Sequence, residues 1–464
     1  MVDSHEICNP RQVKLRGFER LVTMVDNVSM EIVHSMLVWR RKRAAPVPAD
    51  CTQIQELVSI DDISTKNLLR VQASHDSFDS WQKYAEDECN VGFDRYTQLP
   101  FFLTVWVDEE AQHARLMLFS DHFMSDGYSG MVVLNDILQQ ITSLATQVLP
   151  VQAQELPLRP SFYDLWLSSK PLSKAFMKGV ISFFGKAIFH SELTRFRPVL
   201  LAREDQHDFV VPPLLNPTTA SFAEGDPTSM KKTLSKCKEE NVTFGGAVVC
   251  ATLLAFYRAA ESLPDFDSAQ PFKLILDLDY NMRRRVLHPV EENIVGTYVT
   301  FAHLGRLGRK GVNLTTTKFW DLARQAKRDI DSKVNQTMPL TAVPIIFDQQ
   351  INAKIQPSFT KALNIRHSQT SDVNLSNVGH YPFAKNKQNL LEVETLHVYN
   401  SMPHLGPSAV LWVSSVSSFC YSMGHKCEDD SAKTLFTAFV AVCENIGSIR
   451  AEASMADVLE QLEL

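Results

Sequence analysis

The side chains best suited to chemistry lie in one short stretch, residues 120–127, which reads SDHFMSDG. A histidine with an unperturbed pKa near 6.5 can accept a proton at neutral pH, so His122 is suited to act as a general base. Gly127 permits the positive φ that a tight reversal can require. The chain contains 14 histidines, and a structural histidine in a chance H-x-x-x-D-G pattern is the alternative interpretation.

Two other chemistries fit this stretch less well. His122 and Asp126 could share a metal ion, but zinc requires three or four protein ligands, and no H-E-x-x-H motif or cysteine cluster supplies the rest. A serine hydrolase would need G-x-S-x-G, whereas residues 127–131 read GYSGM, with the second glycine one place too early. We therefore predict no metal site here and no nucleophilic serine.

The flanking residues predict how the stretch is positioned. Residues 114–119 (ARLMLF) form a short apolar run typical of a buried strand, and the apolar spacing of residues 131–138 (MVVLNDIL) is typical of a helix. His122 would then lie in a loop between a strand and a helix, where a rigid scaffold can present it to a ligand. This context favours the catalytic interpretation of His122 over the structural one.

Strands and helices are mixed along the rest of the chain. A cap at Asn241–Thr243 precedes an apolar helix that runs toward Glu261. The remaining patterns predict a strand over 272–279, a helix over 319–334, a strand over 410–416 and a helix over 431–446. This mixture predicts layered α/β or α+β architecture in two layers.

Proline-rich segments without clear periodicity suggest where the chain divides. We predict an N-terminal half over residues 1–190, a linker over 191–216 and a C-terminal half over 217–464. A length of 464 residues is compatible with two large domains.

Composition narrows the functional classes. Hydrophobic residues make up 45% and charged residues 21% of the chain, which is typical of a folded globular protein. The net charge of -7 offers no general attraction to a phosphate backbone, so nucleic acid is not an expected partner. The N-terminal residues MVDSHE are polar and acidic, unlike a secretory signal, and we expect a cytoplasmic protein. The eight cysteines are scattered and indicate neither a disulfide framework nor a zinc site.

Several motifs occur in an order that resembles a known family. The H-x-x-x-D-G stretch, in a chain of two similar halves, resembles the acyltransferase superfamily with the chloramphenicol acetyltransferase-like fold. Four further segments are similar to motifs of its alcohol acetyltransferase branch and its relatives: Arg16–Leu21 (RGFERL), Asp279–Arg283 (DYNMR), Val295–Val299 (VGTYV) and Asp372–Gly379 (DVNLSNVG).

The resemblance implies a fold and a set of site residues. The fold would consist of two chloramphenicol acetyltransferase-like lobes that form a pseudo-dimer with a tunnel between them. His122 would be the general base, with Gly127 and Asp126 supporting the site, and Asp126 would pair with Arg283. Arg285 is the alternative partner, since successive residues of a strand face opposite sides and Arg285 would share the side of Arg283. Ser376 and Asn377 are candidates for oxyanion or substrate contacts, and polar residues ending a strand are the alternative interpretation.

The resemblance also implies an activity. The protein would move an acyl group from acyl-CoA, or from an acyl carrier protein, to an alcohol hydroxyl, as a monomer with no permanently bound cofactor. Asp121 stands where peptide-condensing domains usually carry a second histidine, and the D-F-G-W-G motif of plant BAHD enzymes is absent, so a stand-alone alcohol acyltransferase fits best. The alternatives are an amide-forming enzyme with an amine acceptor and a non-catalytic binding protein that retains the fold.

One further segment is strongly amphipathic. Between residues 172 and 189, apolar side chains share one face of a predicted helix, and Lys174, Lys178 and Lys186 lie opposite. The helix could pack its apolar face on the domain core, cover the acyl tunnel, or make a peripheral membrane contact.

Overall fold

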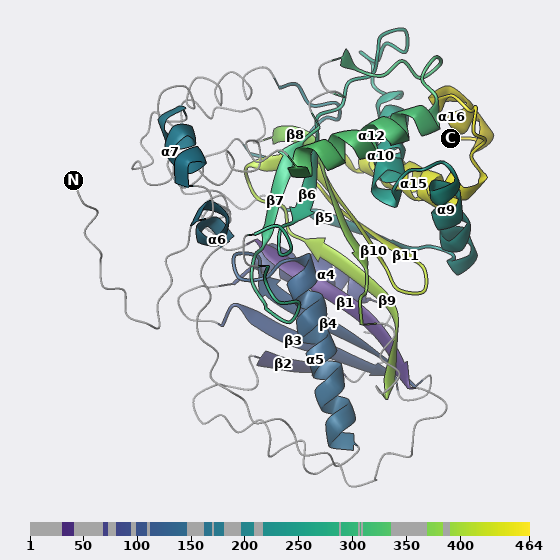
Figure 1. Cartoon of the computed structure of the whole chain (residues 1–464). Helices are drawn as coiled ribbons and strands as arrows, with labels where there is room; N and C mark the ends of the chain where they lie inside the picture. The colour runs from purple at the N-terminus through teal and green to yellow at the C-terminus, as the bar shows by residue number, and fades with distance from the viewer. Residues whose placement is uncertain are drawn as a thin grey trace.

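The structure, a computed structural model, describes residues 30–40, 68–72, 80–93, 99–108, 112–145, 162–168, 171–180, 196–207, 217–286, 289–304, 307, 310–335, 369–383 and 390–464. These residues form two mixed sheets with helices packed on them (Figure 1). Mixed strands and helices were predicted, and the predicted α/β fold class is confirmed.

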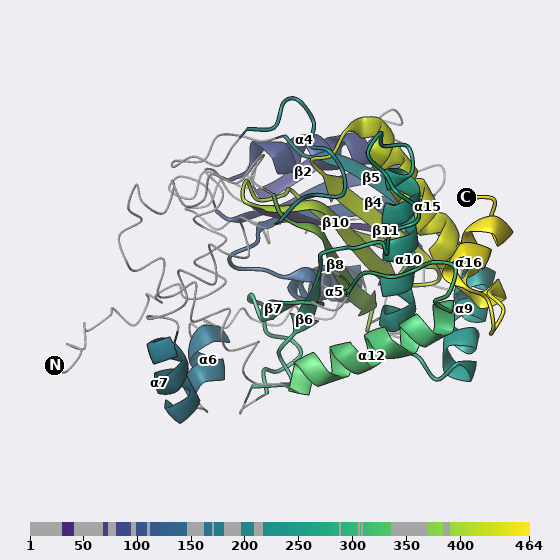
Figure 2. The ribbon, with the colours of Figure 1, turned by 90° about the horizontal axis from the view of Figure 1, so that it is seen from above.

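The first sheet has five strands in the order β2-β3-β4-β1-β9. Its members are β1 (Glu31–Arg40), β2 (Leu69–Gln72), β3 (Phe101–Asp108), β4 (His113–Asp121) and β9 (Leu391–Asn400). Helix α4 (Trp81–Val91) covers one face and α5 (Gly127–Ala145) covers the other (Figure 2). We call this sheet with its two helices the N-terminal lobe.

The alternation of side chains explains why β4 is apolar along most of its length. Phe119 and Met117 pack on the α4 side, whereas Leu118 and Leu116 pack on the α5 side. A strand covered on both faces has no solvated side on which to place polar residues. The strand predicted over 114–119 and the helix predicted over 131–138 are both present, as β4 and α5.

The second sheet has six strands in the order β5-β11-β10-β8-β6-β7. They are β5 (Thr219–Glu224), β6 (Leu276–Asn281), β7 (Val299–His303), β8 (Gln369–His380), β10 (Gly406–Ser415) and β11 (Phe419–His425). The helices of this half are α9 (Pro227–Glu239), α10 (Phe244–Ala260), α12 (Phe319–Asn335), α15 (Asp429–Asn445) with the short 3-10 turn η4 (Ile446–Ser448), and α16 (Met455–Gln461). We call this sheet with these helices the C-terminal lobe.

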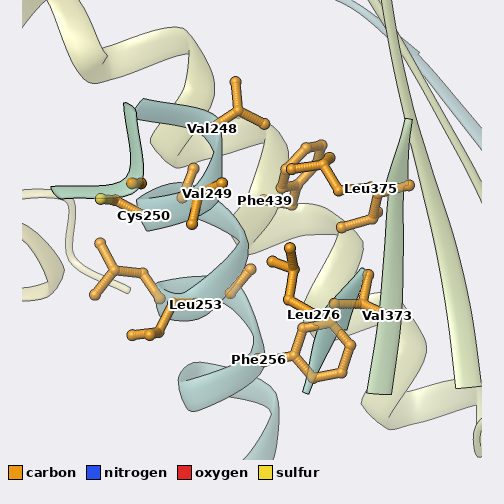
Figure 3. Close-up of a cluster of buried hydrophobic side chains, with 14 of the residues drawn as sticks. Val248, Val249, Cys250, Leu253, Phe256, Leu276, Val373, Leu375 and Phe439 are labelled. Atoms are coloured by element: carbon orange, nitrogen blue, oxygen red, sulfur yellow. The ribbon is translucent and has the colours of Figure 1, made fainter. Parts of the chain in front are cut away.

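The core of the C-terminal lobe is built around α10. The helix begins at the predicted cap, where the Thr243 side chain accepts a hydrogen bond from the backbone N–H of Gly246. Figure 3 shows Phe256 of α10 beside Leu276 of β6 and Val373 of β8, with Leu375 of β8 on the same side of the sheet. Because Leu276 and Leu375 face α10, the alternate residues of the same strands face the opposite side of the sheet. That opposite face is the one turned toward the N-terminal lobe.

One strand crosses between the two halves of the chain. β9 belongs to the C-terminal half but pairs antiparallel with β1, for example Val33 with Tyr399. The predicted division over residues 191–216 therefore does not separate the two sheets completely. Apart from β9, the strands of the first sheet come before residue 190 and those of the second sheet come after residue 217. Backbone pairing over such a sequence distance has no local signature, because the partner strand is chosen only when the lobes assemble.

The other predicted elements are present with small shifts. The strand predicted over 272–279 lies at β6, four residues later at its start, since Phe272 forms only an isolated bridge with Val312. The helices predicted over 319–334 and 431–446 and the strand over 410–416 correspond to α12, α15 and β10.

The amphipathic helix is described only in part. α7 (Pro171–Val180) forms its first turns, while residues 181–189 and the segment Arg16–Leu21 lie outside the described residues. Leu172 is 85% exposed and Phe176 is 64% exposed, so these two side chains do not pack on the core. The core-packing interpretation is wrong for them. The remaining helix upstream, α6 (Phe162–Ser168), buries Phe162 and Trp166.

Among the described helices, none is by itself long and apolar enough to span a membrane. α9 and α10 meet the criteria of length and composition only when taken together, and they are bent by 108°.

Candidate active site

The loop that carries His122 is held on both sides by backbone hydrogen bonds. His122 N–H donates to the carbonyl of Met30 (2.8 Å), just before β1. Its own carbonyl accepts from the Thr297 hydroxyl of the C-terminal lobe (2.8 Å). Asp121, the last residue of β4, turns the chain by accepting at Oδ1 from Phe123 N–H (3.3 Å). The position of His122 therefore depends on both lobes.

The ring of His122 has a defined tautomer. Its Nδ1 lies 2.7 Å from the carbonyl oxygen of Ser125, and a carbonyl can only accept, so Nδ1 carries the hydrogen. The basic lone pair is therefore on Nε2. Burial lowers the pKa of His122, and the Ser125 carbonyl and the nearby Asp126 carboxylate only partly oppose this effect. A neutral imidazole at neutral pH is the form that a general base requires.

The Asp126 carboxylate binds Arg283. The guanidinium donates from Nη1 to Oδ2 (2.7 Å) and from Nη2 to Oδ1 (2.9 Å). Backbone N–H groups of Ser129 (2.8 Å) and Tyr298 (2.9 Å) complete the set. Of the two arginines considered from the sequence, the structure brings Arg283 to Asp126.

The pKa of Asp126 is set by its hydrogen-bond and ion-pair partners. Burial would raise the pKa of Asp126, but the Arg283 guanidinium and the two N–H donors together hold it below its ordinary value of 3.8. Asp126 is 0% exposed and Arg283 is 3% exposed, so the ion pair is screened from water. A buried pair with every carboxylate oxygen doubly hydrogen-bonded is a rigid anchor rather than a proton donor or acceptor.

Two tyrosines and a serine enclose the guanidinium. The Cζ of Arg283 lies 4.9 Å from the ring centre of Tyr128 and 4.8 Å from that of Tyr298, within the range of cation–π contact. Its Nη2 also donates to the Ser129 hydroxyl (2.7 Å), which in turn donates to the carbonyl of Gly296 (2.8 Å) and accepts from Gly296 N–H (3.0 Å). Ser129 thus joins the start of α5 to the C-terminal lobe.

The sequence pattern gave no specific role to Ser129 or Thr297. Gly296 to Tyr298 belong to the VGTYV segment that the family resemblance singled out, but the clamp they form on the His122 loop arises from contacts across 154 to 175 residues. A β-carbon at Gly296 would lie 2.6 Å from Cε2 of Tyr298, so a larger residue would displace that ring.

Gly127 has a role different from the predicted one. It begins α5 and is not among the residues with positive φ, so the expected left-handed reversal is wrong. Its lack of a side chain serves close packing instead: a β-carbon there would lie 3.1 Å from Cγ1 of Val378 and 3.5 Å from Cζ3 of Trp412. Those contacts bring the His122 loop onto the face of the six-stranded sheet that is opposite to α10.

A second histidine, which sequence reasoning missed, supports the start of α5. His34 of β1 is fully buried, and its Nε2 lies 3.0 Å from the carbonyl oxygen of Gly127, to which it donates. Burial lowers the pKa of His34 to about 4, so the ring is neutral. A β-carbon at Gly130 would lie 2.2 Å from the His34 ring, which explains the second glycine of the GYSG segment. No local pattern marks His34, because its role depends on the pairing of β1 with β4.

The two candidates on β8 face opposite sides of the sheet. Ser376 is 6% exposed and lies next to Trp412 in register, on the face that contacts Gly127. Asn377 is exposed, and its Nδ2 lies near the first turn of α10, 3.7 Å from where a β-carbon of Gly245 would be. The alternation of the strand therefore separates the two, and Ser376 is the one on the side of the His122 loop.

Ser376 is hydrogen-bonded to a third residue of this face. The carboxyl of Asp279 on β6 accepts from the Ser376 hydroxyl and from Nδ2 of Asn374 (2.9 Å). Burial raises the pKa of Asp279 to about 6, and its hydrogen bonds to Asn374 and Ser376 only partly offset this. Since the Ser376 hydrogen points at Asp279, donation to an oxyanion would have to compete with that bond.

A family model shows the family of the chain, and solved structures show its fold. Residues 73–446 match a family model described as alcohol acetyltransferase. TRI3 trichothecene 15-O-acetyltransferase from Fusarium sporotrichioides has a similar structure, with a TM-score of 0.65, 12% identity and coverage of 93% of this chain and 94% of that chain. No curated protein sequence matches the chain.

Two further solved structures are similar to the chain. The condensation domain from the Monacolin K polyketide synthase MokA has a TM-score of 0.56 at 10% identity, with coverage of 95% of this chain and 98% of that chain. SgcC5 from Streptomyces globisporus has a TM-score of 0.56 at 12% identity, with coverage of 94% and 98%. At these identities the likeness establishes the fold alone, and the predicted two-lobed architecture is confirmed.

Proposed function

Because the chain belongs to the alcohol acetyltransferase family, we propose that it transfers an acyl group from a coenzyme A thioester to the hydroxyl group of an alcohol, with His122 as the general base. The observation that carries this proposal is the His122 tautomer, in which the Ser125 carbonyl holds Nδ1–H and leaves the basic lone pair on Nε2. A base of this kind contributes roughly a hundred- to ten-thousand-fold to the rate.

In the proposed reaction, Nε2 of His122 takes the proton of the acceptor hydroxyl as its oxygen attacks the thioester carbonyl carbon. The tetrahedral intermediate then collapses, the carbon–sulfur bond breaks, and the imidazolium returns the proton to the leaving thiolate. An ester and free coenzyme A result. The lowered pKa of His122 supports this role, since the ring stays unprotonated at neutral pH. The acidic limb of the pH–rate profile should accordingly lie below pH 6.5.

Asp126 and Arg283 have positioning roles in this proposal. Their ion pair joins the start of α5 to the C-terminal lobe and so fixes the loop that carries His122. Ser376 is proposed as a substrate contact, because its hydrogen bond to Asp279 competes with donation to an oxyanion. A carrier-protein thioester as donor and an amine as acceptor are the alternatives to test alongside.

The test is a thiol-release assay with a panel of acyl-CoA donors, with and without alcohol or amine acceptors. We expect acceptor-dependent release, and a loss of about a hundredfold or more in His122→Ala. His425→Ala is the matched control, because His425 is also buried and also has Nδ1 near a backbone carbonyl, that of Cys427 (3.2 Å), but lies in β11. Equal activity in both variants, or thiol release at the same rate with and without an acceptor, would contradict the proposal.

Three further expectations belong to the same proposal. We propose a monomeric, cytoplasmic enzyme, which size-exclusion chromatography and cell fractionation test directly. We also propose that residues 172–189 contact membranes or cover the acyl site, supported by the exposed Leu172 and Phe176. A vesicle-flotation assay of the intact protein and of Phe176→Ser distinguishes the two, because only a membrane contact requires flotation.

A further inference from the structure

A row of side chains crosses the face of the six-stranded sheet that meets the catalytic loop. Phe301 of β7 pairs with Asp279 of β6, and Ser376 of β8 pairs with Trp412 of β10. The β6–β8 pairing ends with Leu278 opposite Leu375, so the next residues, Asp279 and Ser376, lie side by side on the opposite face. The row therefore runs from Phe301 through Asp279 and Ser376 to Trp412, which approaches Gly127 at the start of α5.

Distances along this row follow from sheet geometry. Neighbouring strands are about 4.8 Å apart, so Asp279 lies on the order of 10 Å from Trp412. The row is thus long enough for a ligand whose one end is near the His122 loop and whose other end reaches Asp279. Asp279 is partly exposed as a residue, whereas Asp126 is fully buried.

Asp279 differs from an ordinary buried carboxylate in its partners. Its two hydrogen-bond donors, Asn374 and Ser376, are both neutral. Within the described part of the chain, no lysine, arginine or histidine forms an ion pair with it, whereas the nearby Asp277 pairs with His303 (Nδ1 to Oδ1, 3.2 Å). A carboxyl that has spare acceptor capacity and no counter-charge is suited to accept a further hydrogen bond from a ligand.

We infer that Asp279, flanked by Asn374 and Ser376, binds a second hydroxyl group of the acceptor alcohol, at the end of this row that lies about 10 Å from Trp412 and away from the His122 loop. This inference rests on the proposed acyl transfer and makes it more specific: the preferred acceptors are polyhydroxylated rather than simple alkyl alcohols. A hydroxyl fits this environment better than an ammonium ion, because Phe301 and Trp412 supply apolar neighbours and desolvating a full charge beside them costs far more.

The experiment compares three acceptors with the same carbon number: octan-1-ol, octane-1,8-diol and octane-1,2-diol. For the parent protein, kcat/KM should be on the order of tenfold higher for the 1,8-diol than for octan-1-ol, because a hydrogen bond to a charged group is made only by the distant hydroxyl. The 1,2-diol should show no such advantage, since its second hydroxyl is too close to the first. In Asp279→Leu the ratio for the 1,8-diol should fall to about one.

Asp277→Asn serves as the matched control on the same strand face, and it should keep the parent ratio. If acyl transfer occurs but Asp279→Leu also keeps the ratio, or if 8-aminooctan-1-ol is preferred to the 1,8-diol, the inference is wrong while the proposed function stands. If none of the acceptors stimulates thiol release and His122→Ala changes nothing, the proposed function itself has failed.

Discussion

Two aspartates on either side of the lobe contact have the same side chain and opposite behaviour. Asp126 is enclosed by a bidentate arginine and two backbone N–H groups, and its pKa is held below 3.8. Asp279 has two neutral donors, and its pKa is raised to about 6. Burial raises the pKa of both carboxyl groups, and only Asp126 has a charged partner, Arg283, that reverses the shift. Asp126 joins the two lobes, whereas the Asp279 carboxyl can accept a further hydrogen bond from a ligand.

The largest difference should appear in stability. Asp126→Ala leaves Arg283 buried without its counter-charge, so we expect a loss of about 3 to 5 kcal/mol in the free energy of unfolding. Asp279→Ala removes no ion pair and relieves the cost of an ionised carboxyl whose pKa is raised, so it should cause no comparable loss and can stabilise the protein by up to about 3 kcal/mol. Urea unfolding of both variants at pH 7 checks this. Equal losses would mean that both carboxylates are structural.

The pH dependence should differ in sign. Asp126 has a lowered pKa in the folded state, so its contribution is present above pH 3.8 and is lost as the pH falls through the folded pKa. Asp279 has a raised pKa, so its contribution is present below pH 3.8 and is lost as the pH rises through about 6.

The Asn variants isolate these effects. The loss in the free energy of unfolding caused by Asp126→Asn should become smaller as the pH falls. The free energy of unfolding of Asp279→Asn should instead rise relative to that of the parent protein as the pH increases from 4 to 7, by at most about 3 kcal/mol. Unfolding free energies of the parent and both variants across this range give the differences, in which other titrating groups such as Asp372 cancel. If the relative stability of Asp279→Asn instead increases as the pH falls, the raised pKa of Asp279 is wrong.

The serines beside each aspartate sharpen the contrast further. Ser129→Ala leaves an Arg283 donor and the Gly296 N–H without their acceptor, so we expect a loss of about 1 to 3 kcal/mol. Ser376→Ala removes one donor from Asp279, which keeps Asn374, and about 1 kcal/mol or less should be lost. Thermal unfolding at one pH ranks the two. The reverse order would show that the Asp279 row, and not the Arg283 clamp, is the tighter network.

The smallest effect is expected where the two regions meet. Gly127→Ala should gain helix stability of up to about 1 kcal/mol but press on Val378 and Trp412, so the net stability should change little. The displaced loop should nevertheless lower kcat by several-fold, because His122 moves with the start of α5. Gly245→Ala is the control, because it also lies near the start of a helix but its β-carbon would lie at an ordinary van der Waals distance, 3.7 Å, from Nδ2 of Asn377. Equal kcat values in both variants would argue against the contact as a positioning device.

The sequence predicted the parts of the site that depend on short-range pattern. The apolar run before His122, the helical spacing after it and the Thr243 cap each have a local physical cause, and the corresponding elements are present. The family to which the chain belongs was identified from the order of its motifs. Gly127 was singled out for the wrong reason, because a glycine required for close packing looks the same in sequence as one required for positive φ.

What the sequence by itself determined is therefore the set of elements and the loop that holds the histidine and aspartate, since hydrophobic periodicity and capping act over a few residues. Only the tertiary structure decided that β9 joins the first sheet, that His34 supports Gly127, and that Asp126 and Asp279 acquire opposite pKa shifts. These outcomes rest on contacts between residues far apart in the chain, such as the 157 positions between Asp126 and Arg283, and on burial, which exists only once the lobes have assembled.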